Sequence, residues 1–287
     1  MENQNGKIAL SGATGFIGTN LRRYLEARGY RVVPLGRGLF LDGREEDLLH
    51  AVSSCSVVVN LAGSPINRRW NARYKKELYD SRVGVTRKLV GAVNRSRETK
   101  LFISASAVGY YPSEGCYDEE NAVQGDGFLA HLCGDWEAEA RKVTPGVRLA
   151  ITRFGVVLAP RGGAFEQMAR PARMGIAAVI GNGRQLFPWI DIVDLMGGME
   201  FLIGNPRLAG VFNFVAPGRV TMGEFMRLVA RHYRSLAVLP VPAPVFRMLL
   251  GEASGFLTEG QCVMPERLLE SDFVFSSPCP EQFLARL

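Results

Sequence analysis

The sequence predicts an α/β protein with a Rossmann-type, doubly wound parallel sheet and a smaller, mainly helical C-terminal lobe. Over the first 160 residues, short apolar runs typical of buried strands alternate with longer stretches typical of helices. A glycine-rich turn joins the first such strand to the first helix, as this fold requires. Beyond Pro160 glycine and proline become denser and the alternation is lost, which marks the second lobe.

The predicted elements follow in the order that a parallel sheet needs. Strands are expected at 8–10, 31–35, 56–61, 101–106, 147–154 and 211–215, and helices at 16–28, 71–94 and 127–141. The strand at 211–215 should return to the sheet from the second lobe. We therefore expect a nucleotide-binding domain at residues 1–160 and a substrate lobe at 161–287.

The turn after the first strand predicts a dinucleotide site. Gly12 permits a sharp turn, Gly15 lets a pyrophosphate approach the backbone, and Gly18 lets the helix pack closely on the strand. The N–H groups and dipole of the helix then face the anion. A tight turn without a ligand is the alternative. The predicted cofactor contacts are Gly12, Ala13, Thr14, Gly15, Phe16, Ile17 and Gly18.

The end of the second strand indicates which dinucleotide is bound. NAD sites usually have an acidic residue here that binds the ribose 2′-hydroxyl, whereas this chain has Arg37 between Gly36 and Gly38. A guanidinium can bind a 2′-phosphate through paired hydrogen bonds, and a carboxylate would repel it. We therefore predict NADP, with Gly36 and Arg37 among the contacts. A solvated loop arginine is the alternative.

Composition narrows the class of protein. The chain has 287 residues, of which 47% are hydrophobic, so it can bury one large core or two coupled cores. No apolar run is long enough for a membrane span, and the polar start Met1–Lys7 is unlike a signal peptide. The five cysteines lack a C-x-x-C pair, and there are only three histidines. We expect no metal site and a reduced, cytoplasmic protein that does not bind membranes.

The net charge of +6 suggests nucleic-acid binding as an alternative function. The densest basic cluster, Arg68–Lys76, alternates with aromatic residues but lies between a strand end and a helix, where a cofactor would bind. Elsewhere basic and acidic residues are interspersed. We therefore expect no nucleic-acid partner.

Several motifs together resemble the extended short-chain dehydrogenase/reductase superfamily. They are Gly12–Gly18, Asn60–Gly63 and Ser104–Tyr110, and the later segments Arg68–Trp70, Asp80–Arg82, Phe187–Asp191 and Glu259–Gln261 narrow the match. The chain looks like the atypical epimerase-family branch that carries a short C-terminal domain of unknown function. Members are often labelled NAD-dependent epimerase/dehydratase, sugar-nucleotide epimerase or cell-division-inhibitor-like proteins.

This resemblance implies further cofactor contacts. Leu61, Ala62 and Gly63 would line the cofactor at a strand end, and Val157 would approach the nicotinamide. Arg82 stands where family members usually have a cofactor-facing asparagine, and Glu77 could accept a hydrogen bond from a ribose hydroxyl. An exposed ion pair between Glu77 and Arg82 is the alternative. Asp42, after a short third strand, is expected near the adenine.

The chain departs from the family pattern at the catalytic site. The ordinary enzymes use a serine or threonine together with a Tyr-x-x-x-Lys pair on the next helix. Ser106 is at the serine position, but residues 127–141 contain neither tyrosine nor lysine. We predict that Ser106 binds the reacting oxygen and that Tyr110 is a substitute proton donor. Tyr110 as a pocket wall, and Tyr111 or His131 as the acid, are alternatives.

Two functions remain open at this stage. One is an NADP-dependent oxidoreductase or epimerase-like enzyme acting on a small molecule such as a sugar nucleotide or a carbonyl compound. The other is a non-catalytic NADP(H)-binding sensor, which the missing Tyr-x-x-x-Lys pair favours. A homodimer is a further expectation.

Overall fold

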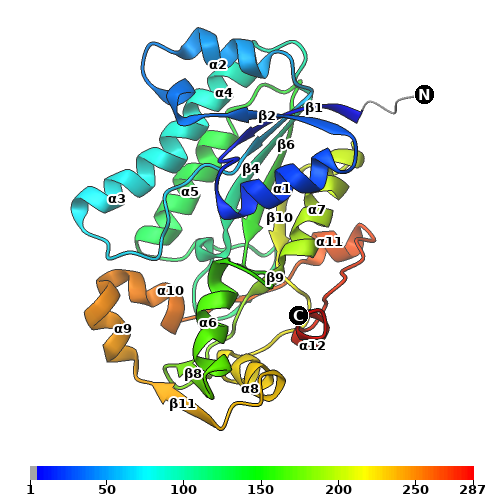
Figure 1. Cartoon of the computed structure of the whole chain (residues 1–287). Coiled ribbons are helices and arrows are strands. Elements are labelled where there is room, and N and C mark those ends of the chain that lie inside the picture. Colours follow the sequence, from blue (N-terminus) through cyan, green and yellow to red (C-terminus); the bar gives the residue numbers. More distant parts are fainter. Residues whose placement is uncertain (1–4) are drawn as a thin grey trace.

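Six parallel strands form the central sheet, in the order β10-β6-β4-β3-β1-β2 (Figure 1). The computed structural model describes residues 5–287, except for the side chains at 5, 249, 250, 256 and 257; the first four residues of the polar start lie outside it. The strands are β1 Asn5–Ser11, β2 Tyr30–Leu35, β3 Val57–Asn60, β4 Leu101–Ala107, β6 Arg148–Phe154 and β10 Gly210–Phe214. β10 pairs with β6, so the last strand returns to the sheet as predicted.

The strand order reverses beside β1, because β2 lies on one side of it and β3 on the other. Ser11 at the end of β1 is in register with Leu35 of β2 and with Asn60 of β3. The carboxyl ends of these strands therefore meet at one edge. In open α/β sheets a ligand binds in the crevice at such a reversal.

Helices cover both faces of the sheet, because each buries one apolar side. α1 Phe16–Glu26 and α7 Ile192–Gly204 contribute to the core on one face. On the other face, α2 Glu45–Val52, α4 Val85–Arg95 and α5 Phe128–Ala140 contribute to a second core. The doubly wound architecture is thus confirmed. Because α7 packs on the sheet, residues beyond 160 belong to both parts of the molecule.

Two predicted elements differ in detail. The helix expected at 71–94 consists of α3 Ala72–Tyr79 and α4, joined by the π-helical turn η2 Asp80–Gly84. The short third strand is wrong: Arg37–Phe40 forms the 3₁₀ helix η1. Leu39 and Phe40 pack against the core beside α2 and α4, and that contact turns the segment away from the sheet edge.

The C-terminal lobe has its own apolar core, to which Phe165, Trp189, Phe225 and Phe283 contribute. Its β8 Ile176–Ile180 and β11 Ala237–Val241 form a parallel pair, and β7 Val156–Leu158 pairs with β9 Trp189–Asp191. The helices of this region are α6 Gly163–Arg173, α8 Met222–His232, α9 Ala243–Leu250, η4 Gly251–Ser254, α10 Gly255–Thr258 and α12 Pro280–Leu284. α11 Glu266–Glu270 packs on the central sheet instead, because its Leu268 belongs to the same core as α1 and α7. Figure 1 shows α9 and α10 across from α3.

A disulfide joins Cys116 to Cys262, which are 146 residues apart. It links the short strands β5 Cys116–Tyr117 and β12 Cys262–Val263, whose register places the two cysteines opposite each other. The expectation that every cysteine is a reduced thiol is therefore wrong for this pair, although Cys55, Cys133 and Cys279 are free. Pairing at this separation depends on docking of the lobe and leaves no spacing pattern in the chain.

No helix formed by residues 5–287 combines the length and the apolar character that a bilayer span needs. Across the same residues, the histidines, cysteines and carboxylates form no group suited to a metal ion.

Candidate functional site

The glycine turn closes tightly at the end of β1. Gly12 has φ +68°, and an added Cβ there would lie 2.5 Å from the carbonyl oxygen of Leu61. An added Cβ on Gly18 would lie only 2.1 Å from the carbonyl oxygen of Gly12. Gly15 is the N-cap of α1 and offers no side chain to its first N–H groups. The turn thus fits a phosphate group held by backbone N–H groups.

A buried hydrogen-bond chain positions the strand ends around this turn. The hydroxyl of Ser11 donates to Asn60 Oδ1 at 2.6 Å, and Asn60 Nδ2 donates to Thr86 at 2.8 Å. Thr86 in turn donates to the carbonyl oxygen of Arg82 at 2.7 Å. Buried polar groups need such partners. These hydrogen bonds therefore fix the end of β3, which leads into the expected cofactor-lining residues 61–63, relative to β1 and the π turn.

Arg82 and Glu77 both hold the loop after β3 and do not pair with each other. Arg82 Nη2 donates to the carbonyl oxygen of Ser64 at 3.0 Å, and Glu77 Oε1 accepts from the Ser64 hydroxyl at 2.9 Å. Arg82 also lies over Trp136, and an added Cβ on Gly63 would lie 3.0 Å from its guanidinium carbon. Burial lowers the pKa of Arg82, which forms no ion pair within the described chain.

Arg37 is exposed at the carboxyl end of β2, as the first residue of η1. Around Gly36 and Gly38, an added Cβ would meet nothing within 4 Å. Among residues 5–287, none of the ion pairs involves Arg37. Its guanidinium is therefore open to an anion beside the glycine turn.

Ser106 is buried at the end of β4, and its hydroxyl donates to Glu137 Oε1 at 2.8 Å. Glu137 comes from α5 and also accepts two hydrogen bonds from Arg153 of β6, at 2.7 and 2.8 Å. The hydrogen that we expected Ser106 to give to a substrate oxygen is thus directed at a carboxylate. Burial alone disfavours the charge of Arg153, but Glu137 outweighs it and raises the pKa of Arg153.

Tyr110 lies directly over this ion pair, at the end of η3 Val108–Tyr110. The guanidinium carbon of Arg153 is 3.6 Å from the centroid of the Tyr110 ring, and Arg153 Nη1 donates to the Tyr111 hydroxyl at 2.8 Å. Tyr111 donates onward to Asn213 at 2.9 Å. In the described chain the Tyr110 hydroxyl has no hydrogen-bond partner, and the residue is half-buried. Its phenol is therefore the group of this cluster that remains able to bind a ligand.

Glu137 and Arg153 were not predicted from the sequence. The available signal was Arg153, a charged residue inside the strand predicted at 147–154. A buried strand tolerates such a charge only where a partner neutralises it. Cys133 and Glu137 stand four residues apart on α5, at the spacing of the family's tyrosine and lysine. Burial and the nearby Glu137 raise the pKa of Cys133 to about 12, so its thiol stays protonated.

The other predicted residues occupy separate places. Val157 is half-buried in β7, and His131 is exposed on α5. Phe16, at the start of α1, contacts the turn that begins α6: added Cβ atoms on Gly162 and Gly163 would lie 3.2 and 2.8 Å from its ring. Phe16 therefore joins the glycine turn to the second lobe. Asp42, which we expected near the adenine, forms an ion pair with Lys88 of α4 on the surface.

Comparison with known proteins gives matches over nearly the whole chain. The model of the NAD dependent epimerase/dehydratase family matches residues 8–214, and a domain of unknown function (DUF1731) matches residues 241–287. The chain is similar to the Arabidopsis thaliana epimerase family protein SDR39U1 homolog, chloroplastic, with 37% identity over 93% of this chain and 82% of that protein. The human epimerase family protein SDR39U1 is 36% identical over 95% and 96%.

Two solved structures are similar as well. The crystal structure of human epimerase family protein SDR39U1 (isoform 2) with NADPH has a TM-score of 0.90 and 35% identity, covering 98% of both chains. A nucleoside-diphosphate sugar epimerase from Corynebacterium glutamicum has a TM-score of 0.77 and 27% identity, covering 96% of this chain and 57% of that one.

Proposed function

The chain belongs to the NAD dependent epimerase/dehydratase family, and we propose that it is an NADP(H)-binding oxidoreductase or epimerase-like enzyme with a non-standard proton donor. In this proposal, residues 1–160 with the strand at 211–215 bind the cofactor. The C-terminal lobe, residues 161–287, contributes to the site of a small molecule such as a sugar nucleotide or a carbonyl compound.

The observation that carries the cofactor assignment is the exposed Arg37 beside a glycine turn that has no room for side chains. Arg37 would bind the 2′-phosphate through paired hydrogen bonds, and the first turn of α1 would bind the pyrophosphate. The similar human protein, whose structure contains NADPH, supports this choice. Arg82, half-buried and without a carboxylate partner within the described chain, would face the nicotinamide ribose or a phosphate from beside Gly63.

When bound, the cofactor supplies the hydride that is transferred. The chain's own part is to hold a substrate oxygen and to give it a proton. Tyr110 is the proposed donor, because its hydroxyl has no hydrogen-bond partner in the described chain and stands at the carboxyl end of β4. Ser106 acts at the same site as a positioning residue, since its hydroxyl holds Glu137 and thereby the guanidinium of Arg153 under the Tyr110 ring.

The cofactor assignment is tested by titrating the protein with NADPH and with NADH. We expect NADPH to bind more tightly, and Arg37→Asp to erase or reverse the preference, because a carboxylate would repel the 2′-phosphate. Arg97→Asp, which changes another exposed arginine, is the matched control and should leave the preference intact. Equal affinities of the wild type for the two cofactors would refute the assignment.

A non-catalytic sensor is the second candidate. It is favoured by α5, where Cys133 and Glu137 stand at the tyrosine–lysine spacing and neither can act as the usual proton donor. A protein that binds NADPH tightly but neither oxidises it with, nor epimerises, any member of a sugar-nucleotide and carbonyl panel would support this second function.

A further inference from the structure

A groove with a volume of about 620 Å³ lies between α8 and the beginning of α12. Val238 of β11 also lines it, so α8 and β11 form its walls together with α12, which lies far from both in the sequence. None of the residues assigned above to cofactor or catalysis lines this groove. It is therefore a second concave site, separate from the glycine turn and from Tyr110.

Three arginines line the α8 side. Arg227 and Arg231 are one helical turn apart, and Arg234 follows just beyond the end of the helix. Like charges at this spacing destabilise a helix unless an anion neutralises them. Over the described residues, none of the three forms an ion pair with a carboxylate. Arg219 adds a fourth guanidinium at the other end of the groove.

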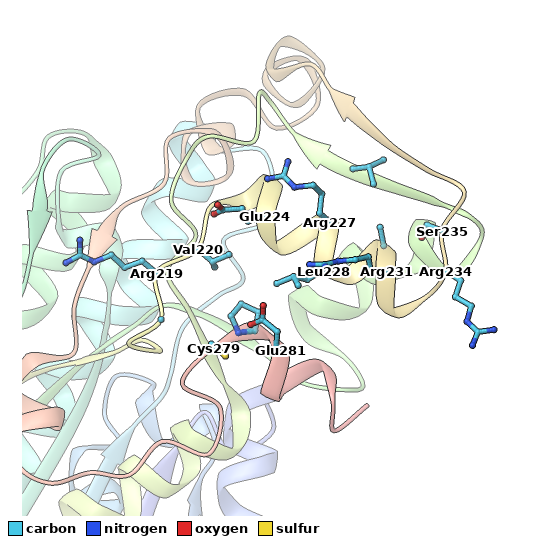
Figure 2. A pocket seen from close by; sticks show the side chains of 14 residues that line it. Arg219, Val220, Glu224, Arg227, Leu228, Arg231, Arg234, Ser235, Cys279 and Glu281 are labelled. Carbon is cyan, nitrogen blue, oxygen red and sulfur yellow. The ribbon is translucent and has the colours of Figure 1, made fainter.

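The four arginines of the groove outnumber its two acidic residues, of which Glu224 offsets part of the charge of Arg227. Glu224 accepts hydrogen bonds from the backbone and hydroxyl of Thr221, at 2.9 and 2.8 Å, and so caps the start of α8. Glu281 stands on the opposite wall and forms no ion pair among residues 5–287. Figure 2 shows Glu281 projecting toward α8, whereas Arg219 and Arg234 point outward at the two ends.

The floor of the groove is apolar. Val220, Ala230 and Pro280 are buried, and Leu228 is half-buried beside them. Figure 2 shows Leu228 next to the side chain of Arg231. The groove thus offers a hydrophobic surface with cationic groups along one side, which suits a ligand with an anionic group and an apolar body.

We propose that this groove binds a phosphorylated small molecule. Arg227 and Arg231 hold its phosphate, because a guanidinium fork matches phosphate oxygens in charge and geometry. The floor around Leu228 contacts the apolar part of the molecule. The volume lies within the range of roughly 300–1,000 Å³ that is usual for small-molecule sites.

The test uses phenyl phosphate and inorganic phosphate as probes, with binding to the full chain measured by calorimetry. NADPH is present at saturation so that the glycine turn does not take up the probes. We expect phenyl phosphate to bind more tightly than inorganic phosphate, and the Arg227→Ala/Arg231→Ala variant to weaken it at least tenfold. The control Arg97→Ala/Arg207→Ala removes the same charge from exposed arginines outside the groove and should weaken it less than twofold.

Two results would overturn the proposal. Equal weakening in the two double variants would mean that the probes respond only to net charge. Equal affinity for phenyl phosphate and inorganic phosphate would mean that the apolar floor contributes nothing. Thermal unfolding of each variant, compared with that of the wild type, shows whether a loss of binding reflects a loss of the fold.

Discussion

At the scale of single residues, the candidate site is built on one buried ion pair. Arg153 and Glu137 are 2% and 1% exposed, so neither charge could be buried there without the other. Ser106 adds a third hydrogen bond to Glu137, and the Tyr110 ring covers Arg153. The pair therefore fixes the two residues that the sequence singled out for catalysis, and it gives them different roles.

These roles predict different effects for two conservative variants. Tyr110→Phe removes the proposed proton donor and should lower turnover by about 10²–10⁴-fold, with little change in NADPH affinity. Ser106→Ala removes one hydrogen bond of Glu137 and should lower the free energy of unfolding by about 1 kcal/mol, with a smaller loss of turnover. NADPH oxidation against the substrate panel and urea unfolding measure the two effects.

Tyr233→Phe changes a tyrosine that bonds Arg173 in the second lobe and is the matched control. Wild-type turnover in the Tyr110→Phe variant would exclude this residue as the acid.

At the scale of elements, the β1–α1 connection depends on close backbone approach. The distance of 2.1 Å between an added Cβ on Gly18 and the Gly12 carbonyl oxygen leaves no space for even a methyl group. The atoms in the way belong to the backbone, so no side-chain rotation relieves the clash. α1 can pack this closely on the turn after β1 only because residue 18 is a glycine.

We expect Gly18→Ala to lower the free energy of unfolding by about 1–3 kcal/mol and to weaken NADPH binding, because the turn must open. Gly91→Ala provides the opposite control. It lies in α4, where an added Cβ meets nothing within 4 Å, and alanine there should stabilise the helix by about 0.5–1 kcal/mol. Both variants are compared with the wild type by urea unfolding. If the two substitutions changed the free energy of unfolding in the same direction, this account would be wrong.

At the scale of the whole molecule, several contacts tie the second lobe to the sheet domain. Arg286, near the C-terminus, forms an ion pair with the buried Asp191, which also caps α7 by accepting from the Val193 N–H at 2.9 Å. Lys75 of α3 pairs with Glu252 of η4. The disulfide between Cys116 and Cys262 adds a covalent link close to Tyr111, which stacks on Tyr117.

Removing this disulfide should destabilise the folded protein, because the bond closes a loop of 146 residues in the unfolded chain and so restricts that chain. We expect Cys116→Ser to lower the free energy of unfolding by about 3–5 kcal/mol. A reducing agent should bring the wild type to the same urea midpoint and leave the variant unchanged. Cys279→Ser, at a free cysteine, should keep the sensitivity to reduction. A wild-type midpoint that does not respond to reduction would show that the bond does not stabilise the protein.

The sequence by itself determined the strand–turn–helix at the start of the chain, the alternation of strands and helices, and the glycines of the cofactor turn. These features are local: each depends on residues a few positions apart, whose spacing selects a backbone conformation. The place of Arg37 at the carboxyl end of β2 could be predicted for the same reason, because a recognisable strand ends two residues before it. The conformation of residues 37–40 could not be predicted in this way, because packing of this segment against α2 and α4 makes it a 3₁₀ helix.

Only the tertiary structure decided the partners of distant residues. Glu137 meets Ser106 and Arg153 because α5 docks beside β4 and β6, and Cys116 meets Cys262 because β5 pairs with β12. The arginines of α8 likewise form a groove only once α12 lies opposite them. Such contacts join residues from 16 to 146 positions apart, so they depend on how elements pack rather than on spacing along the chain.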